Sequence, residues 1–351
     1  LAKRNLTDIQ RYIEFLEQHN HLIRVKSEVD PLFELAGIAK RFEGGKALLF
    51  ERVKGYDYPV LIGLYWNRDL LAKLLQTDSA RLPFVLSDEI RAWQQSPSEP
   101  VIVKQGPANE VVEPTPDLGK LPIPHHAEGD GGRYLTSSVV IAKDPDTGVR
   151  NLSIHRMMVT GKNRLTLLLE ELGHLMDYYK RAEAKGVPLE ITVNNGIDFP
   201  LTVAAASPAS AAPIEMDELG IASQMWGEPE ALTEAQTLAV EAIANAQFVI
   251  EGKILPRVRE PEGPYAEVTG YYAERDDRWV IEVTAITRRR NPVFHSILSG
   301  KEVGNAYGIS AAAGAFAKIH GLVPDVTAVH FADGSVPYHL VVQIDKKHEG
   351  S

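Results

Sequence analysis

The sequence contains no cysteine and no long hydrophobic run. The absence of cysteine excludes disulfide bonds, zinc–thiolate sites and thiol nucleophiles, so a metal ion would take its ligands from His, Asp, Glu, Asn or carbonyl oxygens. No segment approaches the roughly 18 to 20 unbroken apolar residues of a membrane helix, and the first residues are too polar for a secretory signal. We therefore expect a cytoplasmic protein without a membrane span.

The sequence also has fewer basic than acidic residues. The 37 Lys and Arg residues face 47 Asp and Glu residues, which gives a formal net charge of −10. Such a chain repels a phosphate backbone, and no strongly basic stripe offsets the repulsion. We expect no nucleic-acid partner.

The chain has enough apolar residues to form the cores of more than one domain. Hydrophobic residues make up 44% of the 351 residues, and single cores usually stop growing near roughly 250 to 300 residues. The middle of the chain is β-rich with helices packed on it, which predicts an α+β protein. We expect an N-terminal α/β domain over 1–105, a β-rich domain over 106–322 ending in a linker helix at 303–320, and the start of an incomplete domain over 323–351.

Hydrophobic periodicity locates the elements. Apolar residues at helical spacing between Leu6 and Leu16 follow a Thr7 cap with Gln10 three residues later. Residues 134–142 and 149–159 look like the strands of a long hairpin. Further strands are predicted over 165–169, 189–193, 248–254, 270–272, 280–287, 326–331 and 338–344, and further helices over 171–185 and 233–244.

The second hairpin strand carries the sequence Asn-Leu-Ser-Ile-His-Arg at 151–156. Strand alternation places Asn151, Ser153 and His155 on one face and Arg156 on the other, unless a bulge or a strand end relaxes it. An asparagine oxygen can bind a hard metal ion, and the arginine fork suits a carboxylate or phosphate. An exposed strand with ordinary polar residues is the alternative interpretation.

A second motif, Glu-Gly-Pro-Tyr-Ala-Glu at 262–267, places two carboxylates around a turn-prone Gly-Pro. Such a turn could direct Glu262 and Glu267 into one cavity. Near an arginine, one acid can stay ionised while burial keeps the other protonated, as general acid chemistry requires. A solvated turn with two glutamates is the alternative.

Two further residues, His174 and Glu215, are weak signals by themselves. His174 follows Gly173 and could be a histidine on a helix surface, whereas Glu215 lies close to Asp217 and Glu218 in what could be an acidic loop.

Together, these motifs resemble the UbiD family of decarboxylases that use prenylated flavin mononucleotide (FMN). The Asn-x-Ser-Ile-x-Arg pattern is most similar to the ferulic and phenylacrylic acid decarboxylases of that family. The Glu-Gly-Pro-Tyr-x-Glu motif, a Val-Ile-Glu-Gly stretch at 249–252 and the helix around 307–313 extend the resemblance over essentially the whole chain. It implies that 106–322 forms a split β-barrel that binds the flavin.

The resemblance also implies which residues have functional roles. A divalent metal ion, Mn²⁺ or another, would bind Asn151, His174 and Glu215 and bridge to the cofactor phosphate, with K⁺ as a further ion. Arg156, Glu262 and Glu267 would form the catalytic network, and Tyr307 would line the substrate pocket. The cofactor-binding residues would be Asn151, Ser153, Ile154, His155, Arg156, His174, Ser207, Pro208 and Glu215.

The implied reaction is the reversible, non-oxidative decarboxylation of an aromatic, heteroaromatic or α,β-unsaturated carboxylic acid, with CO₂ as the second product. Arg156 would hold the substrate carboxylate, Glu267 would protonate the product, and Glu262 would order Arg156 and relay the proton. A flavin prenyltransferase would supply the cofactor. Two alternatives remain open: an FMN-binding, reductase-like protein, and a non-catalytic flavin-binding fragment or subunit.

The sequence departs from the family pattern in three places. Ala266 replaces the glycine usual before the final acid, and the run at 205–208 lacks the expected serine pair and methionine. Family members also continue beyond Ser351 into a C-terminal domain with dimer contacts, a lysine that contacts the cofactor and part of the substrate pocket. We therefore expect a truncated chain, whose strand at 338–344 has no later partner, and a homo-oligomer at full length.

Overall fold

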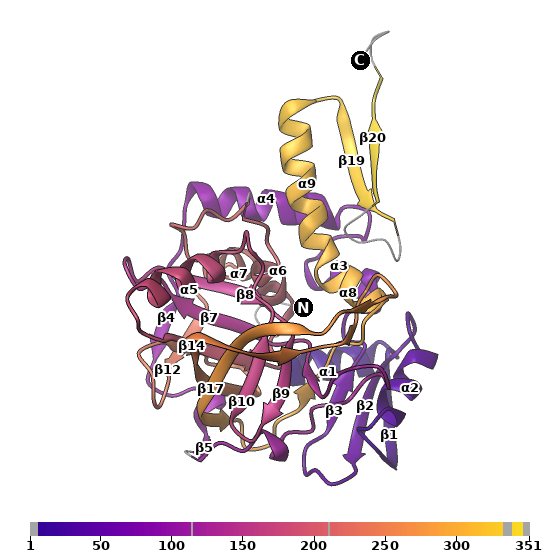
Figure 1. Cartoon of the computed structure of the whole chain (residues 1–351). Coiled ribbons are helices and arrows are strands. Elements are labelled where there is room, and N and C mark those ends of the chain that lie inside the picture. Colours follow the sequence, from indigo (N-terminus) through magenta and orange to yellow (C-terminus); the bar gives the residue numbers. More distant parts are fainter. Residues whose placement is uncertain (1–5, 114, 210, 333–338, 347–351) are drawn as a thin grey trace.

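The computed structural model describes residues 6–113, 115–209, 211–332 and 339–346. Sheets with helices packed over them form the body of the molecule, and α9 (Gly308–Leu322) leads away from it to a two-stranded sheet near the C-terminus (Figure 1). That sheet pairs β19 (Val326–Phe331) with β20 (Leu340–Ile344) in antiparallel fashion. The strand predicted at 338–344 thus pairs with an earlier strand, and its first residue, Tyr338, lies outside the described residues.

A four-stranded sheet near the N-terminus has the order β1-β2-β3-β18. Its last strand, β18, lies far along the chain and pairs in parallel with β3, so a segment near residue 295 completes this sheet. The strands are β1 (Leu22–Val29), β2 (Ala47–Val53), β3 (Val60–Ile62) and β18 (Phe294–His295). The early helices are α1 (Ile9–Gln18), α2 (Glu34–Arg41), α3 (Arg68–Leu74) and α4 (Leu82–Gln95).

The first helix has the predicted apolar face but a different cap. Ile9, Ile13 and Leu16 are buried, as the helical spacing predicts. The cap is Asp8, not Thr7: its backbone is extended and its side chain accepts a hydrogen bond from Gln10 N at 2.9 Å. A carboxylate accepts more strongly than a hydroxyl and favours the positive end of the helix dipole, so the predicted cap was one residue early.

The largest sheet has nine strands in the described part of the chain, with the order β6-β9-β10-β17-β14-β11-β7-β8 and with β5 paired to β17. Its strands are β5 (Val111–Glu113), β6 (Tyr134–Leu135), β7 (Val139–Lys143), β8 (Arg150–Ile154), β9 (Met157–Gly161), β10 (Arg164–Leu167), β11 (Leu189–Asn195), β14 (Phe248–Glu262) and β17 (Asp276–Arg288). The short 3₁₀ turns are η2 (Pro107–Asn109) and η3 (Leu118–Lys120).

This sheet curls until its two ends approach each other. β8 lies at one end of the strand order and β9 next to the other end, yet only His155 and Arg156 separate them in sequence. Because two residues span only a short distance, the ends must meet. The predicted strand 149–159 is therefore two strands with a break at His155. A split barrel requires such curling, and the split-barrel assignment itself stays a prediction.

The helix predicted over 233–244 is wrong. The segment forms a hairpin of β12 (Ala231–Glu234) and β13 (Glu241–Ile243), and β12 pairs in parallel with β4 (Val101–Val103). The buried carboxylate of Glu251 accepts hydrogen bonds from the backbone N–H groups of Gln236 and Thr237 and so holds the turn. This long-range acceptor outweighs the local helical pattern.

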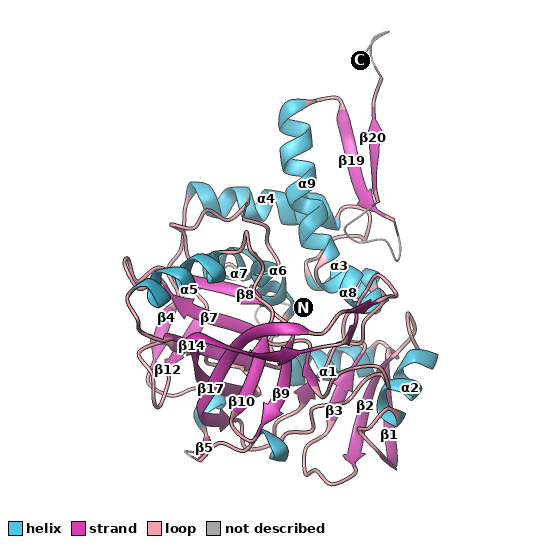
Figure 2. Ribbon diagram, viewed as in Figure 1, coloured by secondary structure: helices cyan, strands magenta, loops and turns pink. Residues whose placement is uncertain are grey.

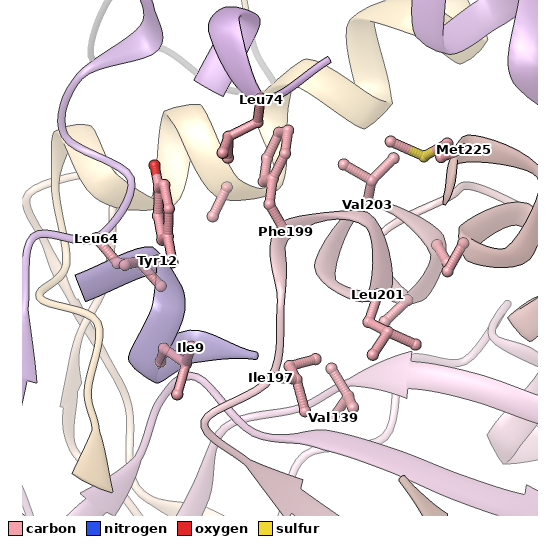
Figure 3. Close-up of a cluster of buried hydrophobic side chains, with 14 of the residues drawn as sticks. Ile9, Tyr12, Leu64, Leu74, Val139, Ile197, Phe199, Leu201, Val203 and Met225 are labelled. Carbon is pink, nitrogen blue, oxygen red and sulfur yellow. The ribbon is translucent and has the colours of Figure 1, made fainter. Parts of the chain in front are cut away.

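Three helices cover the β7–β8 end of the large sheet: α5 (His174–Ala184), α6 (Phe199–Ala205) and α7 (Leu219–Trp226) (Figure 2). Figure 3 shows Phe199, Leu201 and Val203 of α6 in a buried apolar cluster that also includes Tyr12 of α1 and Met225 of α7. The strands β15 (Tyr265–Ala266) and β16 (Tyr272–Ala273) form a small antiparallel sheet, and the short helix α8 (Lys301–Ala306) precedes α9. Among the described residues, no helix is long and apolar enough to span a membrane.

Candidate active site

A cavity of about 540 Å³ lies where the break between β8 and β9 meets α5, α6 and α8. This size is typical of small-molecule and cofactor sites. Most of the residues proposed from the sequence line it. These are Asn151, Ser153, Ile154, His155, Arg156, His174, Ser207, Pro208, Glu267 and Tyr307.

One cluster at this cavity joins Arg156 to the two acids of the second motif. Arg156 donates from Nε and Nη2 to the two carboxylate oxygens of Glu262, both at 3.0 Å, and from Nη1 to Glu267. The Glu262 side chain is 0% exposed, whereas that of Glu267 is 33% exposed and lines the cavity. The predicted meeting of both acids with Arg156 is therefore what the structure shows.

The charge of Arg156 is maintained by these two acids. Burial works against a charged guanidinium, but the hydrogen bonds and charges of Glu262 and Glu267 more than offset it, so the pKa of Arg156 lies above its usual value. The guanidinium carbon also lies 5.1 Å from the centre of the Tyr265 ring, in a cation–π contact. Arg156 is thus fixed in both position and charge.

Two supporting residues carry no recognisable signal in the sequence. Tyr134 on β6 donates its hydroxyl hydrogen bond to Glu262 Oε1 at 2.9 Å. Asp130 accepts from the backbone N–H of Ala266 at 2.8 Å, immediately before Glu267. Both lie more than a hundred residues from their partners, so no local spacing could reveal them.

The turn between the two acids requires glycine at its second position. Gly263 has φ +92°, and a Cβ atom there would lie 3.0 Å from the carbonyl oxygen of Glu274. Backbone in this region favours glycine. The neighbouring Gly131 N donates to Pro264 O at 2.7 Å, which ties the turn to the loop that contains Asp130.

A second cluster brings together Asn151 on β8, His174 at the start of α5 and Glu218 before α7. Glu218 Oε1 accepts from Asn151 Nδ2 at 3.0 Å and lies 2.9 Å from His174 Nδ1, while Oε2 accepts from the backbone N–H of Leu152 at 3.1 Å. β8 ends the strand order of its sheet, so its outer N–H groups need such an acceptor.

The acid predicted from the sequence for this cluster is Glu215, but the structure places Glu218 there instead. Glu215 is exposed and is not among the residues that line the cavity. The helix α7 begins at Leu219, and Asp217 caps its first turn and pairs with Arg150 at 2.9 Å. This arrangement turns the next carboxylate, Glu218, toward β8. Burial raises the pKa of Asp217 to about 6.

The second cluster has one unsatisfied atom. Asn151 Oδ1 is buried and has no hydrogen-bond partner among the described residues, although buried polar atoms nearly always have one. Within the same residues no group of three or more His, Cys, Asp or Glu side chains is placed to hold a metal ion. A metal set here would therefore include the Asn151 amide oxygen. Amide oxygen, imidazole and carboxylate together suit a divalent ion of hard or borderline character, so the residues present fit such an ion.

His155 is held neutral between the two clusters. Its Nδ1 lies 2.9 Å from the carbonyl oxygen of Leu168 and its Nε2 lies 3.0 Å from Ser153 Oγ. Burial lowers the pKa of His155 to about 4. Because His155 and Arg156 follow the end of β8, strict alternation no longer applies, and both line the same cavity as Asn151 and Ser153.

The cavity thus combines two acids bridged by an arginine with a neighbouring polar cluster that contains an unsatisfied oxygen. Enzymes use sites of this class for acid–base chemistry. The chain belongs to the UbiD family. Residues 100–302 match the 3-octaprenyl-4-hydroxybenzoate carboxy-lyase Rift-related domain, and residues 13–90 match the N-terminal domain of the same carboxy-lyase.

Individual relatives agree with this assignment. The chain is 47% identical over 351 residues to an uncharacterised protein of the cooM 5′ region of Rhodospirillum rubrum, across 99% of this chain and 76% of that protein. It is 33% identical to the anhydromevalonate phosphate decarboxylase of Methanothermobacter thermautotrophicus, across 93% of this chain and 75% of that protein. Among solved structures, an evolved dimeric form of the UbiD-class enzyme HmfF from Pelotomaculum thermopropionicum, in complex with prenylated FMN, matches with a TM-score of 0.92 and 40% identity over 98% of this chain and 80% of that chain.

Proposed function

We propose that this chain catalyses the non-oxidative decarboxylation of an aromatic, heteroaromatic or α,β-unsaturated carboxylic acid, with prenylated FMN and a divalent metal ion bound in the cavity. The observation that carries the proposal is Arg156, which joins Glu262 and Glu267 at the cavity that also contains Asn151 and Glu218. Membership of the UbiD family and the prenylated FMN in the HmfF complex support it.

The metal ion would be held by Asn151, His174 and Glu218. The unpaired Asn151 Oδ1 supplies one ligand atom, and Glu218 and His174 already lie within hydrogen-bond distance of each other. Mn²⁺ accepts this mixture of oxygen and imidazole ligands. K⁺ as a further ion stays a prediction.

When bound, prenylated FMN supplies the electron sink that cleavage of the bond to CO₂ requires. The chain supplies the walls of the site. The turn after α6, at 205–208, and the strand β8 line the cavity, and the OH of Tyr307 on its other wall is fixed by donating to the carbonyl oxygen of Thr136 at 3.0 Å. A wall of small residues at 205–208 allows a planar ring system to approach closely.

Arg156 would orient the substrate carboxylate. Its Nε and one N–H of Nη2 are used by Glu262, and one N–H of Nη1 is used by Glu267. One N–H on each of Nη1 and Nη2 remains for a ligand, and N–H groups of a guanidinium form strong, charge-assisted hydrogen bonds to a carboxylate. The tether to Glu262 keeps the guanidinium in a fixed direction.

Glu262 and Glu267 differ in whether they reach the cavity, and this difference assigns their roles. Glu267 lines the cavity, so its carboxyl can deliver a proton to the carbon that loses CO₂. Glu262 is fully buried and is held by both Arg156 and Tyr134. It is therefore the group that positions Arg156 rather than the proton donor.

The test begins with the chain expressed together with a flavin prenyltransferase. We expect prenylated FMN in the ultraviolet–visible and mass spectra, about one divalent metal ion per chain, and release of CO₂ from at least one acid in a panel of cinnamic, hydroxybenzoic and heteroaromatic acids. A loaded chain that releases no CO₂ from the panel would favour a non-catalytic flavin protein.

The variant Glu267→Gln tests the proton donor directly. We expect it to bind flavin and metal like the unmodified chain but to lose about 10²- to 10⁴-fold in kcat, the usual contribution of a general acid. Glu274→Gln, an exposed acid outside the cavity lining, is the matched control and should retain full activity. Full decarboxylase activity in Glu267→Gln would refute the assigned role, and an unchanged flavin reductase activity would support a reductase instead.

A further inference from the structure

The chain leaves the buried part of the molecule immediately before Glu267. Tyr265 is 7% exposed and packs against Tyr134, with 4.6 Å between the ring centres. From residue 266 to residue 279, a range that the structure describes in full, no residue is buried. Ala266 lines a further cavity, of about 320 Å³. Since a packed core is what usually fixes a side chain, the position of Glu267 has to be fixed in another way.

A buried carboxylate anchors the backbone next to Glu267. Asp130 Oδ1 accepts from Ala266 N at 2.8 Å, and Asp130 Oδ2 accepts from Ala127 N at 3.1 Å. Asp130 is 6% exposed, and its carbonyl oxygen lies 3.1 Å from His125 Nε2. Each carboxylate oxygen thus binds one backbone N–H group. Hydrogen bonds to an ionised acceptor are stronger than those between neutral groups, so this anchor is a firm one.

The loop that contains Asp130 also contacts the turn through its backbone. Gly131 N donates to Pro264 O at 2.7 Å. A Cβ atom at Gly131 would lie 2.2 Å from the carbonyl oxygen of Gly263, so only glycine permits this approach. The loop therefore contacts the turn at two consecutive residues, Asp130 and Gly131, and a displaced loop would displace Glu267.

The contact with Arg156 fixes only the far end of the Glu267 side chain. Arg156 Nη1 donates to the Glu267 carboxylate, and such an ion pair is strong while the acid is ionised. A proton donor must carry a proton before it reacts, and the proton removes its negative charge. The backbone anchor at Ala266 does not depend on that charge, so it holds Glu267 in the state that delivers the proton.

We propose that Asp130 is a positioning residue for proton delivery, which acts through the N–H of Ala266 to hold the Glu267 carboxyl within reach of the reacting carbon. This inference rests on the proposed function and adds a residue to it. The reaction converts R–COO⁻ and H⁺ into R–H and CO₂, and the proton that replaces CO₂ on the carbon comes from Glu267. Because a displacement of about 1 Å can lower a rate about 100-fold, Asp130 governs the rate of this step and not the binding of the ligands.

The first test measures the kinetics of the loaded enzyme. Asp130→Ala should lower kcat about 10- to 100-fold, while KM for the acid and the affinities for FMN and Mn²⁺ stay within about twofold. Asp130→Asn keeps an acceptor oxygen and nearly the same shape, so it should lose less. Asp117→Ala is the matched control, because Asp117 also accepts a backbone N–H in a loop, that of Gly119 at 2.9 Å, but does not line the cavity. It should keep full activity.

A double variant distinguishes a positioning role from a general effect on the fold. The losses caused by independent residues multiply, whereas those of residues that act together do not. In the Glu267→Gln background, Asp130→Ala should therefore lower kcat by no more than about twofold. Multiplied losses in the double variant would overturn the proposal, and so would a loss in Asp130→Ala that appears only in KM or in FMN affinity.

Hydrogen exchange tests the anchoring contact without any turnover. In the chain without flavin, exchange of the Ala266 amide, followed by NMR, should be at least about tenfold faster in Asp130→Ala than in the unmodified chain. Asp117→Ala should leave this rate unchanged. Equal exchange rates in Asp130→Ala and the unmodified chain would overturn the proposal, because the Ala266 N–H would then not be held by Asp130.

The two kinds of measurement separate this inference from the proposed function. If exchange at Ala266 depends on Asp130 but no acid is decarboxylated, the proposed function fails, and the role of Asp130 in proton delivery fails with it. If Glu267→Gln loses activity but Asp130→Ala keeps it, the proposed function holds and the inference alone fails.

Discussion

The two polar clusters of the candidate active site face the same cavity but balance their charges differently. Glu262 and Glu267 are matched by a cation of the chain itself, Arg156, and by the Tyr134 hydroxyl. In the other cluster, Glu218 is contacted by an amide, an imidazole and a backbone N–H, and Asn151 Oδ1 has no partner among the described residues. The first cluster pairs its charges within the chain, whereas the second leaves a buried oxygen unpaired among the described residues, and we propose that a metal ion binds there.

This difference indicates how the two clusters respond to loss of a member. A buried carboxylate whose only cation is removed keeps its desolvation cost and loses its compensation, so the fold should suffer. A cluster completed by an external ion should instead lose affinity for that ion, with a smaller effect on the fold without it. Three experiments test this contrast.

The largest expected effect comes from Arg156→Gln. The change leaves the fully buried Glu262 without its cation, so the free energy of unfolding should fall by about 3 to 5 kcal/mol. Urea unfolding at pH 7 without flavin or metal measures it. In the double variant Arg156→Gln, Glu262→Gln, most of the loss should be recovered, because the uncompensated charge is gone. A single variant as stable as the unmodified chain would show that Arg156 does not balance a buried charge.

The first cluster could be predicted from the sequence because its three charged members lie in two compact motifs. In each motif the functional residues are only a few positions apart, at 151–156 and 262–267, and the motif order matches the family. The two positioning residues, Tyr134 and Asp130, could not be predicted, since each acts across more than a hundred residues. Such contacts depend on how the sheet curls, and residue spacing does not contain that information.

The second cluster was predicted only in part. Asn151 and His174 were located correctly as neighbours, but three acids at 215, 217 and 218 compete for the third place. Only the start of α7 decides which one faces β8, and helix boundaries are the least certain part of a sequence-based prediction. The cap at Asp8 reflects the same limit, whereas the hairpin in place of a helix at 233–244 depends on a partner from another strand, Glu251.

The second experiment compares Glu218→Gln with Glu215→Gln. Loss of the Glu218 carboxylate should weaken Mn²⁺ binding at least about 100-fold, because it removes the only negatively charged ligand of the set. Glu215→Gln should leave the affinity unchanged. Calorimetric titration of the chain without flavin measures both. Equal loss of Mn²⁺ affinity in the two variants would indicate that Glu215 belongs to the metal site. No loss of affinity in either variant would show that the metal ion does not bind to this cluster.

Binding of Mn²⁺ should also raise the free energy of unfolding. At a Mn²⁺ concentration about 100 times its Kd, the unmodified chain should gain about 2.7 kcal/mol in free energy of unfolding, whereas Glu218→Gln should gain almost nothing at that concentration. The Arg156 cluster should show no such dependence on metal. A chelator would then distinguish the two clusters in one thermal scan of each variant.

A third buried acid, Glu302 of α8, extends the comparison to a carboxyl that forms no salt bridge within the described part of the chain. Its side chain is fully buried and accepts from the backbone N–H groups of Gly63, at 3.2 Å, and Tyr65, at 3.3 Å. Burial raises the pKa of Glu302 to about 8, against roughly 4.3 in an unfolded chain. The Glu302 carboxyl therefore avoids a buried charge by keeping its proton.

A further effect follows from this raised pKa. The folded chain binds the Glu302 proton more tightly than the unfolded chain, so its contribution to stability is complete below about pH 4.3 and is lost as the pH rises through about 8. Glu302→Gln resembles the protonated form and cannot titrate. Between pH 5 and pH 8, Tm of this variant should therefore rise relative to the unmodified chain by on the order of 5 °C, while the exposed Glu274→Gln follows the unmodified chain throughout. Parallel Tm curves for Glu302→Gln and the unmodified chain would show that folding does not raise the pKa of Glu302.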